Sequence, residues 1–202
     1  MWIIYLKEKN FIFGVIIFLF LVNCDNLYSL QKSDISRKKW ATKLEIDGLD
    51  NFHKINDNLY RSAQPKAIGI ENAEKLGIGT IISLRSKQKD EKLSPSTNLN
   101  LIHIKMRAWK PEYETAVLLM RILDPDNPNL DGKPALVHCY HGADRTGFTI
   151  ALYRIVYENW TQEEAIEEML DGGYGYHKIW RDIIKFLKEL NIDEFKNDIL
   201  NN

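Results

Sequence analysis

The sequence predicts an α/β domain with a central sheet of four to five strands, mostly parallel, and helices on both faces. Short apolar runs of four to six residues, typical of buried strands, alternate with longer segments whose apolar residues recur at helical spacing. No internal repeat is visible, and 202 residues suit one domain of ordinary size.

The expected strands are short and bounded by turn residues. An Asn-Asp-Asn turn at 56–58 separates the first two, which predicts that they lie close together. The later strands are richer in Ile, Leu and Val, as buried parallel strands are. The five segments are 51–55, 58–62, 80–84, 99–105 and 134–138.

Helices are expected between and after these strands. Thr161 and Glu164 have the spacing of a capping box at one helix start, and Gly172 and Gly173 are typical of its end. The expected helices are 65–76, 112–123, 146–158, 162–171 and 177–190.

One strand-to-helix junction carries an unusual set of polar residues, His138-Cys139-Tyr140-His141-Gly142-Ala143-Asp144-Arg145-Thr146. Gly142 eases the turn, and the backbone N–H groups before the helix can surround an anion at the helix N-terminus. The spacing therefore predicts a phosphate-binding loop next to a thiol. Its members are Tyr140, His141, Gly142, Ala143, Asp144 and Arg145.

Two residues of this junction are expected to carry chemistry. A thiol at a helix N-terminus beside an arginine ionises readily, so Cys139 is expected to act as a thiolate nucleophile. The planar fork of Arg145 matches two phosphoryl oxygens and stays charged at any working pH. The Thr146 hydroxyl is a candidate donor to the sulfur of Cys139 when the thiolate leaves.

These residues resemble the cysteine-dependent protein tyrosine and dual-specificity phosphatases, in particular the small, often exported bacterial dual-specificity type. Three further stretches, 58–65, 79–85 and 153–175, share the resemblance, which spans roughly residues 52–190. It implies a hydrolase that removes phosphate from proteins through a phosphocysteine at Cys139.

The resemblance also implies a general acid, and here the sequence departs from the family. Most relatives carry an aspartate on the loop after the strand that precedes the catalytic one. The corresponding residues, 106–114, contain no aspartate, so Glu112 and Glu114 are candidates. Asp144 in the phosphate-binding loop is the preferred candidate, because the two glutamates also suit a solvated first helical turn.

Other residues have a structural as well as a functional interpretation. Arg61 is expected to brace the phosphate-binding loop, and Trp109 to pack beside the loop at 106–114. Tyr174, Tyr176 and His177 follow a glycine pair and are candidates either for the site entrance or for a packed helix junction.

Two other functions stay open. An inositol phosphate or phosphoinositide phosphatase shares the loop but favours extra cations at positions that hold Tyr140 and Ala143 in this chain. An inactive phosphate-binding module would account for the missing aspartate, but it has no use for Cys139 beside Arg145.

No metal, other cofactor or nucleic acid is expected. His138 and His141 flank Cys139, but residues so close in sequence can hardly surround one tetrahedral ion. The formal net charge is −1, and no basic stripe marks a nucleic-acid surface. We expect a monomer whose partner is a phosphoprotein substrate.

The N-terminal residues predict export. An apolar run at 11–22 follows Lys7 and Lys9; it is shorter than the roughly 20 residues of a membrane span and suits the core of a signal peptide. Residues 1–23 are therefore expected to be a signal peptide or a membrane anchor. Cys24 resembles the lipidated cysteine of bacterial lipoproteins, although Asn23 before it is unusual.

The remaining residues complete the expected organisation. The polar segment 24–39 is expected to be a flexible linker, and 40–195 the catalytic domain. The protein is then exported and membrane-tethered, in the periplasm or cell envelope. Its two cysteines, Cys24 and Cys139, predict no structural disulfide.

Overall fold

The computed structural model describes residues 39–87 and 97–201. The predicted signal peptide or anchor, Cys24 and all but the last residue of the predicted linker lie outside the described residues. Among the described helices, none is both long enough and apolar enough to cross a membrane.

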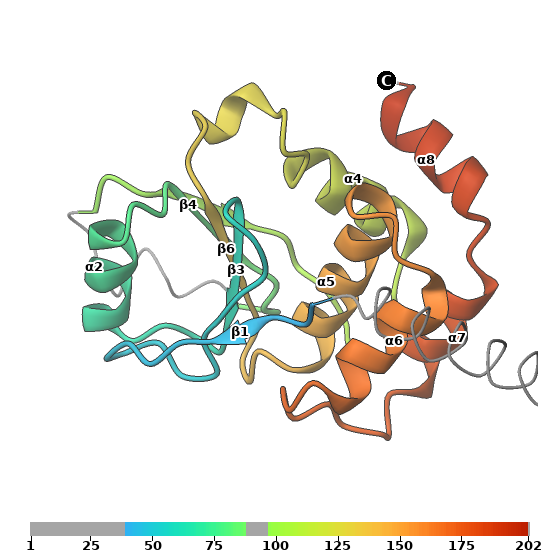
Figure 1. Ribbon diagram of the computed structural model, residues 1–202, viewed down its shortest axis with the longest axis horizontal. Coiled ribbons are helices and arrows are strands. Elements are labelled where there is room, and N and C mark those ends of the chain that lie inside the picture. Colours follow the sequence, from blue (N-terminus) through green and yellow to red (C-terminus); the bar gives the residue numbers. More distant parts are fainter. Residues whose placement is uncertain (1–38, 88–96, 202) are drawn as a thin grey trace, which may run out of the picture. The chain divides into compact units, whose positions relative to one another are not determined.

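A six-stranded sheet in the order β1-β2-β3-β6-β4-β5 forms the centre of the domain (Figure 1). The mostly parallel sheet that the sequence predicts is confirmed: β3, β6, β4 and β5 are parallel, and β1 and β2 pair antiparallel at one edge. The strands are β1 (Thr42–Lys43), β2 (His53–Lys54), β3 (Leu59–Ser62), β4 (Thr80–Ser83), β5 (Asn100–His103) and β6 (Ala135–His138). The added strand, β1, is exposed and lacks the short apolar run that predicts the buried strands of the sheet.

The register of the sheet aligns the carboxyl ends of its parallel strands. Ser62 of β3 and Ser83 of β4 both pair with His138 of β6, and His103 of β5 pairs with Ser83. The chain therefore leaves these four strands at one edge of the sheet. The segments that follow, including the one that begins at Cys139, start side by side, which is where open α/β sheets bind their ligands.

Helices cover both faces of the sheet, as predicted (Figure 1). On one face, α2 (Ala67–Lys75) packs over a core that includes Ile81 and Leu136. On the other face, the next residues along the same strands, Ile82 and Val137, belong to a larger core under α5. The elements after β5 are α4 (Tyr113–Ile122), η1 (Pro128–Leu130), α5 (Asp144–Tyr157), α6 (Gln162–Asp171), α7 (Arg181–Glu189) and α8 (Ile192–Leu200).

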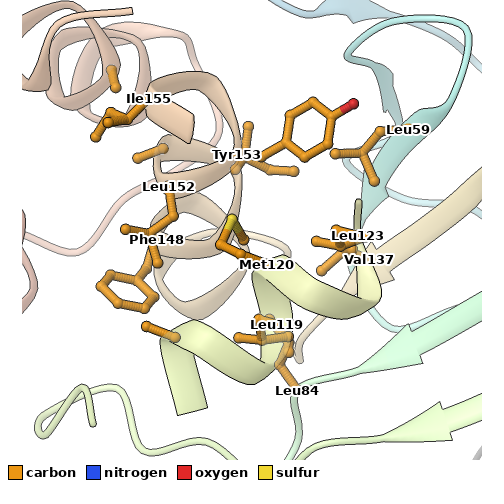
Figure 2. Packing of buried hydrophobic residues seen from close by; sticks show 14 of the residues in the cluster. Leu59, Leu84, Leu119, Met120, Leu123, Val137, Phe148, Leu152, Tyr153 and Ile155 are labelled. Atoms are coloured by element: carbon orange, nitrogen blue, oxygen red, sulfur yellow. The ribbon is translucent and has the colours of Figure 1, made fainter. Parts of the chain in front are cut away.

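The helix that follows the phosphate-binding loop, α5, is buried along most of its length. Phe148 and Leu152 of α5 lie in the same core as Leu119 and Met120 of α4 and Val137 of the sheet (Figure 2). Each fully buried side chain of this size stabilises the folded state by about 1.5–3 kcal/mol relative to the same side chain left exposed. This packing fixes the N-terminus of α5 relative to the end of β6.

Three helix starts differ from the sequence prediction by two or more residues. Helix α2 begins at Ala67 rather than 65. Helix α5 begins at Asp144, two residues earlier than expected, so Asp144 and Arg145 belong to its first turn. Helix α7 begins at Arg181 rather than 177. The reason is the preceding loop, in which Gly173 (φ +80°) and Gly175 (φ +81°) adopt left-handed backbone.

At the C-terminal end, one expected feature is confirmed and one helix is new. The capping box of α6 forms, with the backbone N–H of Glu164 donating to Thr161 and that of Thr161 to Glu164. Helix α8, which the sequence prediction missed, continues past the expected domain end at 195. Asn191 caps it by accepting a hydrogen bond from the backbone N–H of Glu194 at 3.3 Å.

Candidate active site

The predicted phosphate-binding loop lies between β6 and α5. Cys139 is 2% exposed at the start of the loop. Gly142 has a φ of +68°, and a Cβ atom there would lie 2.4 Å from the carbonyl oxygen of Ser62 at the end of β3. Glycine is therefore required for both the left-handed backbone and the close approach of the two segments.

The carbonyl oxygens of three successive loop residues accept hydrogen bonds from donors outside the loop. The donors are the backbone N–H of Gln64 to Tyr140 (3.2 Å), Nδ2 of Asn51 to His141 (3.0 Å) and the guanidinium of Arg61 to Gly142 (2.7 Å). In contrast, the N–H groups of residues 140–143 donate no hydrogen bond within the part of the chain that the structure describes. These N–H groups are free to bind an anion.

Arg145 is anchored beside the same loop. One of its guanidinium nitrogens donates to the carbonyl oxygen of Leu84, the residue after β4, at 3.1 Å. The side chain also lines the cleft described below, which leaves its other N–H groups available to phosphoryl oxygens.

Thr146 does not make the hydrogen bond that the sequence suggested. Its hydroxyl is buried and has no hydrogen-bond partner among the described residues, Cys139 included. Because α5 begins earlier than expected, Thr146 lies inside the first helical turn rather than at its start. Its role toward the departing thiolate stays a prediction.

Arg61 braces the loop from behind. Its side chain is fully buried, and its guanidinium lies 3.7 Å from the centre of the Tyr174 ring. Burial lowers the pKa of Arg61 to about 10, opposed by Tyr174 and Glu168, so the side chain stays charged at neutral pH. The geometry agrees with the bracing interpretation, and Tyr174 supports Arg61 rather than lining the entrance.

A buried network extends this brace to the other helices. The Tyr174 hydroxyl donates to Glu168 of α6 at 3.1 Å, and burial together with the charge of Glu168 raises the pKa of Tyr174 well above its usual range. Arg154 of α5 donates two hydrogen bonds to the same carboxylate, at 2.8 and 2.9 Å. The backbone N–H of Ala41 donates a further one at 2.7 Å. Tyr174, whose ring faces the Arg61 guanidinium, is thereby linked through Glu168 to α5, to α6 and to Ala41.

An open cleft of about 530 Å³ adjoins the loop. Its walls combine cationic and aromatic side chains, and the rings of Trp109 and Trp180 lie 6.2 Å apart. Trp109, which belongs to the loop at 106–114, is 56% exposed and lines the cleft at its rim. The lining residues are Arg85, Ser86, Lys87, Ala108, Trp109, Tyr140, His141, Asp144, Arg145, His177, Ile179 and Trp180.

Two loop residues form one wall of the cleft. Tyr140 is exposed, and the guanidinium of Arg85 lies 5.0 Å from the centre of its ring. The edge of His141 meets the same ring, with 4.7 Å between the ring centres. His138, by contrast, is buried below the loop and donates from Nδ1 to the carbonyl of Cys139 at 3.2 Å. Among the described residues, no cluster of His, Cys, Asp and Glu is arranged to hold a metal ion.

The three candidates for the general acid occupy different surroundings. Asp144 is nearly buried and lines the cleft, where it accepts hydrogen bonds from the backbone N–H and from Nδ1 of His177. Glu112 and Glu114 are exposed at the start of α4, and neither is among the described residues that line the cleft. The geometry therefore favours Asp144 over the two glutamates.

Sequence reasoning missed several residues of the cleft. Lys87, Ile179 and Trp180 line it, but none belongs to a motif or to a pattern with a chemical meaning. The sequence places His177 in an aromatic cluster after the glycine pair but does not predict its contact with Asp144. Nothing in the sequence signals this contact, because the two residues are 33 positions apart.

Comparisons with known proteins agree with the geometry. A model of the tyrosine phosphatase family matches residues 48–201. The dual specificity protein phosphatase TpbA of Pseudomonas aeruginosa is 28% identical over 167 residues, which cover 83% of this chain and 74% of TpbA.

Solved structures resemble the domain as well. A crystal structure of a Cys-to-Ser variant of P. aeruginosa TpbA in complex with phosphotyrosine has a TM-score of 0.71 and 26% identity, covering 81% of this chain and 97% of that one. The core catalytic domain of the PP-IP phosphatase SIW14 from S. cerevisiae has a TM-score of 0.63 at 21% identity, covering 76% and 93%. The second likeness shows a shared fold alone.

Proposed function

This chain belongs to the tyrosine phosphatase family, and we propose that it hydrolyses phosphotyrosine in proteins through a phosphocysteine at Cys139. The observation that carries the proposal is the row of backbone N–H groups at 140–143, between Cys139 and Arg145, which make no hydrogen bond to any residue that the structure describes. Such a row, next to a helix N-terminus and a guanidinium, suits a tetrahedral dianion.

In the first step, the Cys139 thiolate attacks phosphorus. A bond forms between Sγ and phosphorus as the bond between phosphorus and the phenolic oxygen breaks. The phenolic oxygen takes a proton from a donor group located at Asp144 in the cleft. Arg145 binds two of the phosphoryl oxygens, while its contact with Leu84 fixes its direction. The charge that spreads over these oxygens is stabilised by donors already in place.

In the second step, water attacks the phosphocysteine. The new bond between oxygen and phosphorus forms as the bond to sulfur breaks, and the electron pair returns to Sγ of Cys139. The attacking water gives one proton to the group beside Asp144 that protonated the phenolic oxygen in the first step, and inorganic phosphate leaves.

The walls of the cleft support an aromatic phosphate ester as substrate. Trp109, Tyr140 and Trp180 offer ring faces and edges to a phenyl group, and the volume of about 530 Å³ accommodates it. The match with TpbA, whose variant was crystallised with phosphotyrosine, supports the same choice.

Phosphate release from a substrate panel tests the proposal. We expect kcat/KM for a phosphotyrosine peptide to exceed that for the matching phosphoserine peptide by at least about tenfold, because the serine ester has no ring to fill the cleft. The measurement is phosphate released per minute from each peptide at equal concentration. Equal rates on both peptides would contradict the proposed preference.

An inositol polyphosphate belongs in the same panel. Arg85 and Lys87 place two cations in the cleft wall beside Arg145, which is the observation in favour of a substrate with several phosphates. Within the phosphate-binding loop, however, Tyr140 and Ala143 add no positive charge and Asp144 opposes it. A higher kcat/KM for the inositol phosphate than for the phosphotyrosine peptide would transfer the function to that class, and no release from any substrate would indicate a binding module.

We also propose that the protein is exported and tethered to the membrane of the cell envelope by its N-terminus. The support is the sequence of residues 1–24: two lysines, an apolar run at 11–22 and Cys24. The substrate would then be an exported or membrane-bound phosphoprotein.

Fractionation tests this location. We expect the full chain in the membrane fraction, and Cys24→Ala in an unprocessed form, because removal of the thiol removes the site of lipid attachment. If the wild type and Cys24→Ala are both unprocessed and both retained in the membrane fraction, a lipid at Cys24 is excluded and a plain anchor remains. Recovery of the wild-type chain from the cytosol would contradict the whole proposal.

A further inference from the structure

Asp144 and His177 form a closely fitted pair inside the cleft. The Asp144 carboxylate accepts a hydrogen bond from the backbone N–H of His177 at 2.8 Å and from its Nδ1 at 2.9 Å. Asp144 is nearly buried, whereas about half of the His177 side chain is exposed. Both residues line the cleft that contains the phosphate-binding loop.

The hydrogen bond between Asp144 and His177 determines which imidazole nitrogen of His177 can exchange a proton with substrate. A carboxylate only accepts hydrogen bonds when ionised, so Nδ1 of His177 carries the proton in this contact. The other nitrogen, Nε2, has no hydrogen-bond partner among residues 39–87 and 97–201. Because Asp144 binds both the backbone and the ring of His177, it fixes the orientation of the imidazole on the cleft wall.

The charges around this pair are mostly positive. The centres of the His141 and His177 rings lie 5.3 Å apart. Burial raises the pKa of Tyr176, and the negative charge of Asp144 raises it further. Asp144 is the one carboxylate among the described residues that line the cleft. The cations that face the same space are Arg85, Lys87 and Arg145.

We propose that His177, oriented by Asp144, is the catalytic residue that exchanges protons with the leaving oxygen and with water. The proposal rests on the phosphatase function above and deepens it. It also accounts for the missing aspartate at 106–114, because a proton donor elsewhere in the cleft makes a carboxylic acid in that loop unnecessary.

The proton balance of the two steps follows. The cycle starts with His177 as an imidazolium, which carries a proton on Nδ1, donated to Asp144, and a second on Nε2. As Sγ of Cys139 bonds to phosphorus, the phenolic oxygen leaves with the electron pair and takes the Nε2 proton. The neutral imidazole then accepts a proton from the attacking water as the bond between sulfur and phosphorus breaks. His177 ends the cycle with its proton, and Asp144 keeps its charge throughout.

Leaving-group dependence tests the proposal. Phenolate from phosphotyrosine has a pKa near 10 and needs a proton, whereas an activated nitrophenolate needs little help. We expect His177→Gln to lower kcat about a hundredfold on a phosphotyrosine peptide and less than about tenfold on nitrophenyl phosphate.

Matched variants separate the roles. Asp144→Asn still accepts a hydrogen bond from the His177 backbone, so we expect a smaller loss of kcat on the phosphotyrosine peptide than for His177→Gln. Lys178→Gln changes the next residue, which is exposed and does not line the cleft, and should match the wild type on both substrates. Vanadate binding by each variant verifies that the loop is intact.

The outcomes are distinct. A His177→Gln variant with wild-type leaving-group dependence overturns the proposal. So does a selective defect in Asp144→Asn with His177→Gln near normal, because the proton then comes directly from Asp144. If the wild-type chain hydrolyses no aryl phosphate, the proposed function itself fails, and that result is independent of His177.

Discussion

Replacement of Cys139 by serine is expected to abolish turnover while oxyanion binding persists. A serine hydroxyl is not ionised at neutral pH and is a far weaker nucleophile than a thiolate, so the covalent step stops. The free N–H groups at 140–143 and Arg145 remain in place and still bind vanadate. We expect kcat on an aryl phosphate to fall by at least about a thousandfold.

The measurement pairs steady-state kinetics with vanadate titration, followed by the fluorescence of Trp109 and Trp180 in the cleft. Cys24→Ser, which changes the other cysteine of the chain, is the matched control and should keep the wild-type kcat in a detergent extract. A Cys139→Ser variant with more than a few per cent of the wild-type kcat would rule out the phosphocysteine.

Arg145→Lys is expected to be nearly inactive, although it keeps the positive charge. The guanidinium of Arg145 donates to Leu84 with one nitrogen and has further donors in the same plane for two phosphoryl oxygens. A lysine ammonium is a compact charge that cannot make both contacts. Loss of one such set of donors to the transition state costs about 2.7–4 kcal/mol, which is a 10²- to 10³-fold loss of kcat.

The comparison of kcat/KM with vanadate affinity shows whether Arg145 acts on the transition state. We expect vanadate binding to weaken along with kcat/KM, because both depend on the same two contacts. Arg181→Lys is the control, since Arg181 is exposed at the start of α7 and does not line the cleft. An Arg145→Lys variant with preserved kcat/KM would contradict the role given to this residue.

Local patterns predicted the parts of the site that lie close together in sequence. The strand before Cys139 and the helix after Arg145 follow from apolar spacing, and Gly142 occupies the left-handed position that the turn requires. The start of α5 at Asp144 differs by two residues, because backbone hydrogen bonding rather than side-chain spacing decides where a helix begins.

Contacts between distant segments were beyond sequence reasoning. The pairing of Asp144 with His177 depends on the path of the loop before α7, where two glycines adopt left-handed backbone. The cleft wall formed by Ile179 and Trp180 depends on the same path. The place of Glu112 at a helix start predicts that it is exposed. That it does not line the cleft follows only from the fold of the loop before it.

The hydrogen bonds that the loop carbonyls of Tyr140, His141 and Gly142 accept affect the affinity for phosphate but not the choice among phosphorylated molecules. Because Gln64, Asn51 and Arg61 order the loop when the domain folds, an incoming anion does not have to organise it and keeps most of the hydrogen-bond energy. A rigid ring of N–H groups, however, treats all tetrahedral oxyanions of similar size and charge alike. Discrimination among phosphorylated molecules therefore has to come from the group attached to the phosphate, and so from the aromatic walls around Trp109 and Trp180.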